Sequence, residues 1–416
     1  MEQGGPMYTF LVWAIGSFFT VFVLLVLVIV AMKSRRQWQE SRWRTRRAQL
    51  EPALFKYVAG REPLETYTGG ALDASDRPIV EQIFFDLSRI VSGHVIDRAH
   101  QAFEQLGFVD YYIHRLDSHR WWTRAEAAEK LGLMGSRRAI PPLVAKMDDL
   151  IPDVRVRVAR ALGSIGSPEA VRPLVHALRA PGRWSAIRVS GILIAAGNEA
   201  VQALLEEFYA LPMHAQLSAI DIFARIRSLD TVGLLRDLLR HEQPDLRARA
   251  AFALGTIGDP GSLDLLTGAL RDRAWAVRAM AAKALGRIRD ESCIPALCGA
   301  LADTEWWVRA NAAEALKNKG ERGTQALLSM LDAQDIYAAQ QAVQMLQEAG
   351  VLDTLVSQLG SQEPGRRQEA LEVMAKLVRL RRTDLLTEMA HNHPESSIRQ
   401  RLSILLGLRL SPEPVA

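Results

Sequence analysis

A ten-residue pattern recurs along this chain at a nearly constant interval, and it constrains the fold more than any other feature. Its clearest copy is 277–286, which reads V-R-x-x-A-A-x-A-L-G. Other copies lie at 154–163, 246–255 and 308–317, with a looser one at 123–132. The position three residues past each of these five copies is Gly135, Gly166, Gly258, Arg289 or Gly320, and weaker copies place Gly197, Arg227 and Gly350 in the same series. The successive intervals are 31, 31, 30, 31, 31, 31 and 30 residues. A fixed period of this length indicates stacked structural repeats.

Each repeat has the pattern of two helices joined by a turn. In 292–319 the first helix has apolar residues three or four positions apart, at Ile294, Leu297, Cys298 and Leu301. The second helix has a buried stripe at Val308, Ala312, Ala315 and Leu316. One such hairpin cannot bury its own apolar face, so it must stack on the next one. The sequence therefore predicts an all-α fold built as an α-solenoid.

An aspartate precedes the pattern arginine by six residues in three of the copies. These pairs are Asp149 and Arg155, Asp272 and Arg278, and Asp303 and Arg309. With these Asp-Arg pairs and this period, the chain resembles HEAT repeats, in particular the bacterial group related to phycobilin lyase subunits. The resemblance covers 118–350 well and 351–409 loosely. It implies a HEAT-type α-solenoid in which Asp and Arg form a stacking ladder between repeats and the V-R helices line the concave face. The arginine is absent at Ala186, Gln216 and Ala339, so we expect the ladder to be interrupted there.

An uncharged apolar segment precedes the repeats. No charged residue occurs from Gln3 to Met32, and 10–30 consists almost wholly of Val, Leu, Ile, Phe and Trp. At about 1.5 Å per residue, a helix of this length spans a hydrocarbon core of about 30 Å. A cleaved signal peptide is the alternative, but it would have a basic start and a shorter apolar core. We therefore predict one N-terminal transmembrane helix over 8–32.

A basic segment follows at once. Residues 33–47 contain seven basic residues and one acid, a net charge of +6, which leaves −2 for the rest of a chain whose total is +4. Basic flanks stay on the cytoplasmic side, so we predict a single-pass protein of the inner (plasma) membrane, with its N-terminus outside and its repeats in the cytoplasm. The segment serves at least as a topology signal. A further interpretation is that it binds anionic lipid headgroups through Lys33, Arg35, Arg36, Arg42 and Arg44.

Composition and spacing predict the remaining boundaries. We expect a basic juxtamembrane helix at 33–59, a linker rich in Gly and Pro at 60–78, an atypical N-terminal helical cap at 79–117, a solenoid at 118–409 and a tail at 410–416.

No catalytic constellation stands out. His241-Glu242 is the one His-Glu pair among nine histidines, whereas the HEAT-type di-iron hydroxylases require several. Cys293 and Cys298 lie five apart on one predicted helix, a poor spacing for a disulfide or a metal site. Phosphate-binding loops, nucleophile elbows and H-E-x-x-H motifs are absent from the sequence. We therefore predict a protein that is no enzyme and has no cofactor and no metal.

The second helix of each repeat, which begins with the V-R pattern, has exposed positions that recur from repeat to repeat. In the middle repeats, the residues at these positions are mainly basic. Two positions of the repeat place cations on the predicted concave face, at Arg157, Arg160, Arg188, Arg249 and Lys283, with Arg225 and Arg287 close by. The acidic counterparts at these positions are Glu126, Glu129, Asp221 and Glu314, so we expect the middle repeats to be net basic, with acids towards both ends. A solvated mixed surface is one interpretation, and binding of an acidic protein segment is the other. A short basic stripe on a body without net positive charge disfavours nucleic acid.

Aromatic residues share two further positions of the repeat. Trp121, Trp275 and Trp306 occupy one of them, and Trp122, Trp184, Trp307 and Tyr337 occupy the next. The period places them in a row where each second helix begins. They are either packing residues or interface anchors, and we single out Trp275, Trp306 and Trp307 as candidate anchors.

These features predict a membrane-anchored HEAT-repeat scaffold that binds a protein partner at the cytoplasmic face of the membrane. The alternative is an accessory subunit of a membrane enzyme complex, such as an envelope-polysaccharide glycosyltransferase. That alternative favours small residues for helix packing in the anchor, where the sequence offers only Gly16 and Ser17.

Overall fold

The computed structural model describes residues 5–60, 76–90, 94–180 and 184–407. These residues form α-helices and short 3-10 helices, with no strand among them, so the predicted all-α fold is confirmed. The chain divides into two compact units, unit 1 (Met1–Ile165) and unit 2 (Gly166–Ala416). Most of the predicted linker 60–78 and the predicted tail 410–416 lie outside the described residues.

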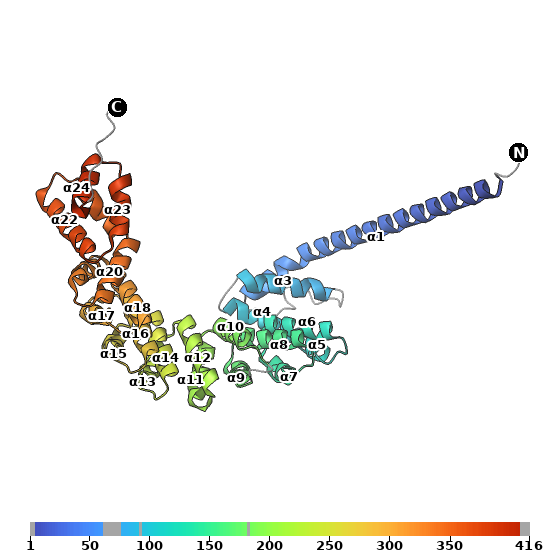
Figure 1. The fold of residues 1–416 in the computed structure, drawn as a ribbon. Coiled ribbons are helices and arrows are strands. Elements are labelled where there is room, and N and C mark those ends of the chain that lie inside the picture. Colours follow the sequence, from blue (N-terminus) through green and yellow to red (C-terminus); the bar gives the residue numbers. More distant parts are fainter. Residues whose placement is uncertain (1–4, 61–75, 91–93, 181–183, 408–416) are drawn as a thin grey trace. The chain divides into compact units, whose positions relative to one another are not determined.

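Unit 1 begins with one long helix and continues with shorter ones (Figure 1). Its elements are α1 (Gly5–Ala59), α3 (Arg77–Ile90), α4 (His94–Gln105), α5 (Phe108–Arg115), α6 (Trp121–Met134), η2 (Arg137–Ala139), α7 (Ile140–Ala145) and α8 (Pro152–Ile165). The last turns of α1 pack against α3 and α4, where Leu54, Tyr57 and Val58 are buried. The apolar and basic segments of the sequence therefore belong to a single helix whose end is part of the core of unit 1.

Unit 2 consists of helix hairpins. Its elements are α9 (Pro168–Ala177), α10 (Ala186–Ala196), α11 (Asn198–Glu207), η3 (Phe208–Ala210), α12 (Met213–Ile226), η4 (Leu229–Thr231), α13 (Val232–Leu238), α14 (Pro244–Ile257), η5 (Pro260–Ser262), α15 (Leu263–Ala269), α16 (Trp275–Arg287), α17 (Ile294–Ala300), α18 (Trp306–Lys317), α19 (Gly320–Ser329), η6 (Met330–Asp332), α20 (Ile336–Glu348), α21 (Val351–Gln358), α22 (Pro364–Arg379), α23 (Thr383–Asn392) and α24 (Ser396–Leu406). The second helices of successive hairpins pack on one another, in the order α10, α12, α14, α16, α18 and α20 (Figure 1).

The period of the sequence is visible in the backbone. A left-handed residue with positive φ lies at one position of nearly every repeat, namely at Gly135, Gly166, Gly197, Arg227, Gly258, Gly320 and Gly350. Arg381, whose φ is 58°, lies 31 residues past Gly350 and continues the same register into the degenerate repeats. A left-handed residue at a helix end allows the chain to reverse into the next helix.

Arg289 is the exception to this rule, because it is not among the residues with positive φ. Helix α16 instead ends in an extended residue, Ile288. Lys319 of the following repeat is buried and donates hydrogen bonds to the carbonyl oxygens of Leu285, at 2.7 Å, and Ile288. The ammonium group satisfies carbonyls that a left-handed cap would otherwise serve, and its charge suits the C-terminus of a helix.

Candidate protein-binding surfaces

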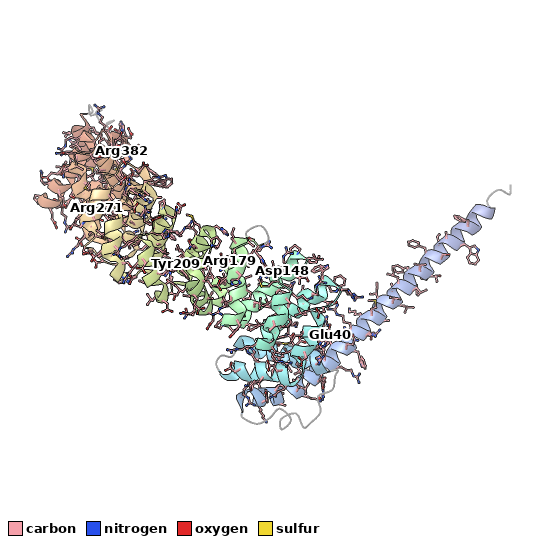
Figure 2. The ribbon with its side chains drawn as sticks, turned by 90° about the horizontal axis from the view of Figure 1, so that it is seen from below. Glu40, Asp148, Arg179, Tyr209, Arg271 and Arg382 are labelled. Carbon is pink, nitrogen blue, oxygen red and sulfur yellow. The ribbon has the colours of Figure 1, made fainter. Side chains whose placement is uncertain are left out.

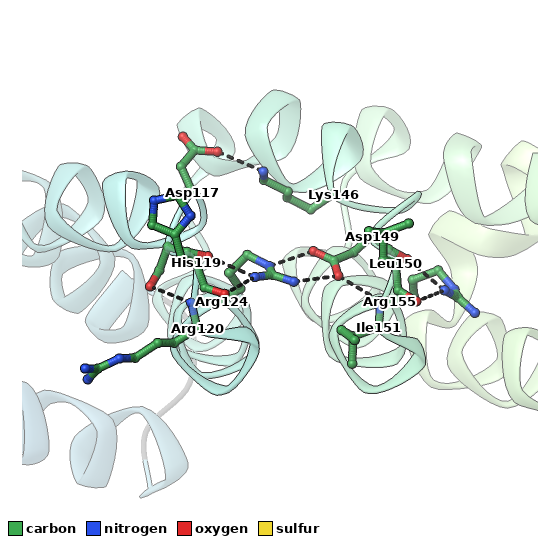
Figure 3. Close-up of polar contacts among 10 residues, drawn as sticks. Asp117, His119, Arg120, Arg124, Lys146, Asp149, Leu150, Ile151 and Arg155 are labelled. Carbon is green, nitrogen blue, oxygen red and sulfur yellow. Dashed lines mark hydrogen bonds and ion pairs between the residues drawn. The ribbon is translucent and has the colours of Figure 1, made fainter.

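Arginine and aspartate side chains join successive repeats. In unit 1, Nε and Nη2 of Arg124 donate to the two carboxylate oxygens of Asp149 at 2.7 and 2.9 Å (Figure 3). Nη1 of Arg124 also donates to the carbonyl oxygen of Ser118 at 2.9 Å. Unit 2 repeats this geometry, with 2.7 Å between Arg247 Nε and its Asp272 oxygen. The same contact is 2.6 Å between Arg278 and Asp303. Each carboxylate thus binds the arginine that lies 25 residues earlier in the chain.

The arginine six residues after each aspartate makes a different contact. Arg155 donates to the main-chain oxygen of Asp149 at 2.7 Å (Figure 3), and Arg309 does so to Asp303 at 2.8 Å. Among the positions without arginine, Gln216 supplies part of this contact, because its amide donates to the carbonyl oxygen of Phe208 at 3.2 Å. The ladder residues therefore brace the turns of the repeats and leave no reactive group free.

The ladder holds its carboxylates in the charged form. The hydrogen bonds from Arg124 lower the pKa of Asp149. Burial acts to raise the pKa of Asp272 and of Asp303, but hydrogen bonds from arginine and from a backbone amide outweigh burial and lower both pKa values. These shifts are typical of structural ion pairs.

A groove of about 950 Å³ crosses α10, α12, α14 and α16 in unit 2. Its lining includes small residues of the second helices, among them Ser190, Gly191 and Gly255. Gly191 takes the repeat position that Arg160 and Lys283 occupy elsewhere, so the α10 side of the groove lacks the long side chain that would fill it. The hollow therefore coincides with a repeat whose sequence departs from the V-R pattern.

The α10 side of the groove is apolar. Ile187 and Ile194 line it, and Ile187 is 86% exposed. An isoleucine with this much exposed surface gains free energy when a ligand covers it. This side offers a seat for an apolar side chain.

The lining of the groove also includes cations. Arg225 is exposed and lines the groove together with Arg227 and Arg287. The guanidinium of Arg287 lies 4.7 Å from the centre of the Phe252 ring and donates a hydrogen bond to the Thr256 hydroxyl. These contacts fix the charge of Arg287 at the wall of the groove.

One carboxylate lies among these cations. Burial raises the pKa of Asp221, whereas Arg249, whose Nη1 atom lies 3.0 Å from the Asp221 carboxylate, acts to lower it. Because Arg249 offsets the charge of Asp221, the lining residues present a positive surface.

The predicted basic column is only partly assembled around this groove. Arg287 lines it, Arg249 pairs with Asp221 at its wall, and the ammonium of Lys283 lies 5.9 Å from the Phe252 ring. Arg188 is exposed on α10. Arg157 and Arg160 belong to α8 of unit 1, where Arg157 pairs with Glu129.

Several groove residues had no place in the sequence-based site. Ile187, Ile194, Arg227 and Phe252 are the main ones. Comparison of equivalent positions in successive repeats does indicate these residues, but through side-chain size and not through charge. Gly191 marks the hollow and Phe252 marks its wall.

An aromatic edge lies where α16, α18 and α20 begin. Trp275, Trp306, Trp307 and Tyr337 are 46, 49, 57 and 61% exposed. The rings of Trp306 and Trp307 meet edge to face with their centres 4.8 Å apart. Trp184, which shares this repeat position, is buried, so it is a packing residue. The tryptophans of unit 1 at the same positions, Trp121 and Trp122, are exposed.

Within the described residues, no three His, Cys, Asp or Glu side chains come together as metal ligands would. Burial raises the pKa of the thiols of Cys293 and Cys298, which form no disulfide. The surfaces that stand out are therefore the groove and the aromatic edge.

Several solved structures are similar to this chain at low sequence identity. An engineered protein is 20% identical over 86% of this chain and 98% of its own, with a TM-score of 0.30. Human deoxyhypusine hydroxylase is 23% identical over 74% of this chain and 98% of its own, with a TM-score of 0.26. The complex of CpcE and CpcF of phycocyanin lyase from Nostoc sp. PCC7120 is 20% identical over 58% of this chain and 94% of that one, with a TM-score of 0.27.

The sequence itself matches a family. No curated protein matches the chain. The profile of HEAT repeats matches residues 109–195, 201–275 and 268–347, which together make up more than half of its 416 residues. This chain therefore belongs to the HEAT-repeat family.

Proposed function

We propose that this protein is a membrane-anchored HEAT-repeat scaffold whose groove in unit 2 binds an acidic segment of a protein partner. The observation that carries this proposal is the groove itself, whose lining includes the apolar Ile187 and Ile194 and the cationic Arg225 and Arg287. Such a surface fits a segment in which an apolar side chain stands close to carboxylates. The apolar contact supplies affinity, and the charges supply specificity and association rate.

The apolar part of α1 supports the anchoring. Its large apolar side chains are exposed, from 39% at Val23 to 80% at Phe18, and they project from the helix beyond Glu40 (Figure 2). Among the described residues, α1 is the one helix long and apolar enough to cross a membrane. An uncovered apolar surface of this size calls for lipid or another protein. The basic residues after it favour an inner-membrane protein with the repeats on the cytoplasmic side.

Binding accounts for the structure better than catalysis does. The ladder carboxylates Asp149 and Asp272 have lowered pKa values and are bound to arginine, and Asp221 is paired with Arg249. Neither thiol is activated, because burial raises the pKa values of both. Repeat arrays of this kind present an extended surface to partners.

Binding of defined peptides to the full-length protein in detergent tests the proposal. We would use fluorescein-labelled twelve-residue peptides that contain one Leu-Phe pair and zero, two or four glutamates. Affinity should rise with the number of glutamates and fall as salt increases, since exposed charges are screened. Reversal of Arg225 and Arg287 to Glu should weaken binding of the four-glutamate peptide at least about tenfold.

The matched control reverses two exposed arginines outside the groove, Arg240 and Arg271, to Glu. This control has the same net charge as the variant with Arg225 and Arg287 reversed, and it should bind the peptide as the wild type does. Equal losses in both variants, or affinities that do not depend on glutamate, would contradict the groove proposal.

The aromatic edge is the second candidate for the partner site, and its exposure is the observation that favours it. Trp306→Ala combined with Trp307→Ala should leave peptide binding unchanged if the groove is the site. If this variant loses binding while the reversal of Arg225 and Arg287 has no effect, the aromatic edge is the site.

A further inference from the structure

The seven basic residues at 33–47 of α1 fall into two groups with different surroundings. Arg46 and Arg47 pair with carboxylates of unit 1, with 2.7 Å between Arg46 and Asp76 and 2.8 Å between Arg47 and Asp86. The other five are exposed, and they are Lys33, Arg35, Arg36, Arg42 and Arg44. We call these five the collar. The pairs of the first group belong to the fold of unit 1, whereas the collar faces the surroundings.

The collar begins where the apolar segment of α1 ends. At about 1.5 Å per residue, Lys33, Arg35 and Arg36 lie within about 5 Å of one another along the helix axis. That is about the depth of one headgroup layer next to the hydrocarbon core. Arg42 and Arg44 lie about 14–17 Å beyond Lys33 along the axis, so their long side chains come within about one Debye length of the headgroups.

The collar charges also surround the helix. With about 100° between consecutive residues, Lys33 and Arg44 project on one side and Arg35 and Arg42 on the opposite side. A protein partner would meet one face of α1, whereas lipid headgroups surround an isolated transmembrane helix. The distribution of charge therefore favours lipid as the occupant.

Glu40 is the one acid in this stretch, and it offsets little of the charge. It lies 3.2 Å from Arg36, but the two side chains are 51 and 83% exposed. An exposed pair of this kind is worth little and leaves most of the positive potential in place. Trp38 is 58% exposed, with the guanidinium of Arg42 4.3 Å from its ring centre. Tryptophan at this depth is typical of the membrane interface.

We propose that the collar binds anionic phospholipid, recognising phosphate groups that carry no compensating amine, in the leaflet next to unit 1. This rests on the proposed membrane anchoring of α1. The five cations attract anionic lipids into the shell of lipid molecules around the helix. These lipids displace zwitterionic ones from the same shell.

Lipid selectivity can be measured directly on the full-length protein. We would reconstitute it into phosphatidylcholine vesicles with trace spin-labelled phosphatidylglycerol or phosphatidylcholine, and determine the motionally restricted fraction of each. Phosphatidylglycerol should associate at least about threefold more strongly at low salt. The ratio should approach one in 1 M NaCl, where the Debye length is about 3 Å.

Two variants separate the collar from general charge. Replacing all five collar residues by Gln should bring the ratio to about one, and replacing its four arginines by Lys should keep it. A control with Arg160, Arg240, Arg271, Arg289 and Arg382 replaced by Gln removes the same charge from exposed positions of the repeats and should keep the wild-type ratio. A wild-type ratio near one at low salt, or a collar variant that keeps the preference, would overturn the proposal.

Flotation after alkaline carbonate treatment distinguishes this proposal from the anchoring on which it rests. If the protein does not float with the vesicles, the anchoring itself fails. If it floats but shows no lipid preference, only the collar proposal fails.

Discussion

A Cβ atom built on Gly255 of α14 would lie 2.3 Å from the Cα atom of Ala284 on α16. The same close approach occurs between Gly286 and Ala315 in unit 2 and between Gly132 and Ala161 in unit 1. The glycine that ends the V-R-x-x-A-A-x-A-L-G pattern is therefore present because the backbones of successive second helices touch there.

Gly255→Ala should force α14 and α16 apart and loosen the packing around Leu254 and Leu285. We expect a loss of about 2 kcal/mol or more in the free energy of unfolding, measured by urea unfolding of the full-length protein followed by circular dichroism. Gly268→Ala is the control, because its Cβ would meet no atom within 4 Å. That control should gain about 0.5–1 kcal/mol from helix propensity, and a neutral Gly255→Ala would refute the packing argument.

Arg227→Gly should stabilise the protein. Arg227 has a φ of 59°, in a repeat position where most other copies have glycine, and the left-handed region costs a side-chain-bearing residue about 1 kcal/mol. Arg289→Gly is the matched control, since Arg289 occupies the same repeat position without a positive φ and should gain nothing. Because Arg227 lines the groove, the more stable variant should also bind the four-glutamate peptide more weakly. Stability that falls in Arg227→Gly would show that the arginine has contacts worth more than the strain.

Asp303→Asn should weaken the coupling between two repeats. The side chains of Asp303 and Arg278 are only 12 and 15% exposed, and the change leaves a nearly buried guanidinium without its carboxylate. We expect a loss of about 1–3 kcal/mol in the free energy of unfolding. Glu291→Gln breaks the exposed pair with Arg322 and should cost less than about 0.5 kcal/mol. Equal effects of the two changes in urea unfolding would mean that the ladder contributes no more than surface charge.

The ladder also predicts a pH dependence. The pKa values of Asp149, Asp272 and Asp303 are lowered in the folded protein, so their contribution to stability is complete above the unfolded value of about 3.9. It should be lost as pH falls below about 4, through the lower pKa values of the folded state. Urea midpoints measured between pH 3 and pH 7 should show this loss, with a smaller acid slope in Asp303→Asn. A wild-type stability that stays level down to pH 3 would contradict the pKa directions.

Topology can be tested with fusions at Ala416. The basic residues after the apolar segment predict that the C-terminus is cytoplasmic, so a fluorescent protein fused there should fluoresce and alkaline phosphatase should be inactive. The reverse pattern would place the repeats on the other side of the membrane.

The period made the repeats predictable, because the apolar residues that form each helix hairpin also pack it against the neighbouring hairpins. The period shows which arginines and aspartates share a repeat position. Sequence spacing alone does not show that Arg278 donates hydrogen bonds to the side-chain carboxylate of Asp303 and to the main-chain carbonyl of Asp272. The exception at Arg289 depends on Lys319 from the next repeat, a contact that no pattern within one copy contains. The groove depends on the side-chain sizes of Gly191 and Phe252. The predicted binding face rested on the charge of the exposed residues, and charge does not indicate a hollow.

The continuity of α1 has a consequence for orientation. Because its last turns are buried in the core of unit 1, rotation of the helix about its own axis carries unit 1 with it. Each residue inserted between 33 and 45 would turn unit 1 by about 100° around the helix axis and move it by about 1.5 Å along the axis, while seven inserted residues would restore nearly the same azimuth about 10 Å further away. With the proposed membrane anchor, the number of residues in this helix would therefore set the azimuth of unit 1 about the membrane normal as well as its height above the bilayer.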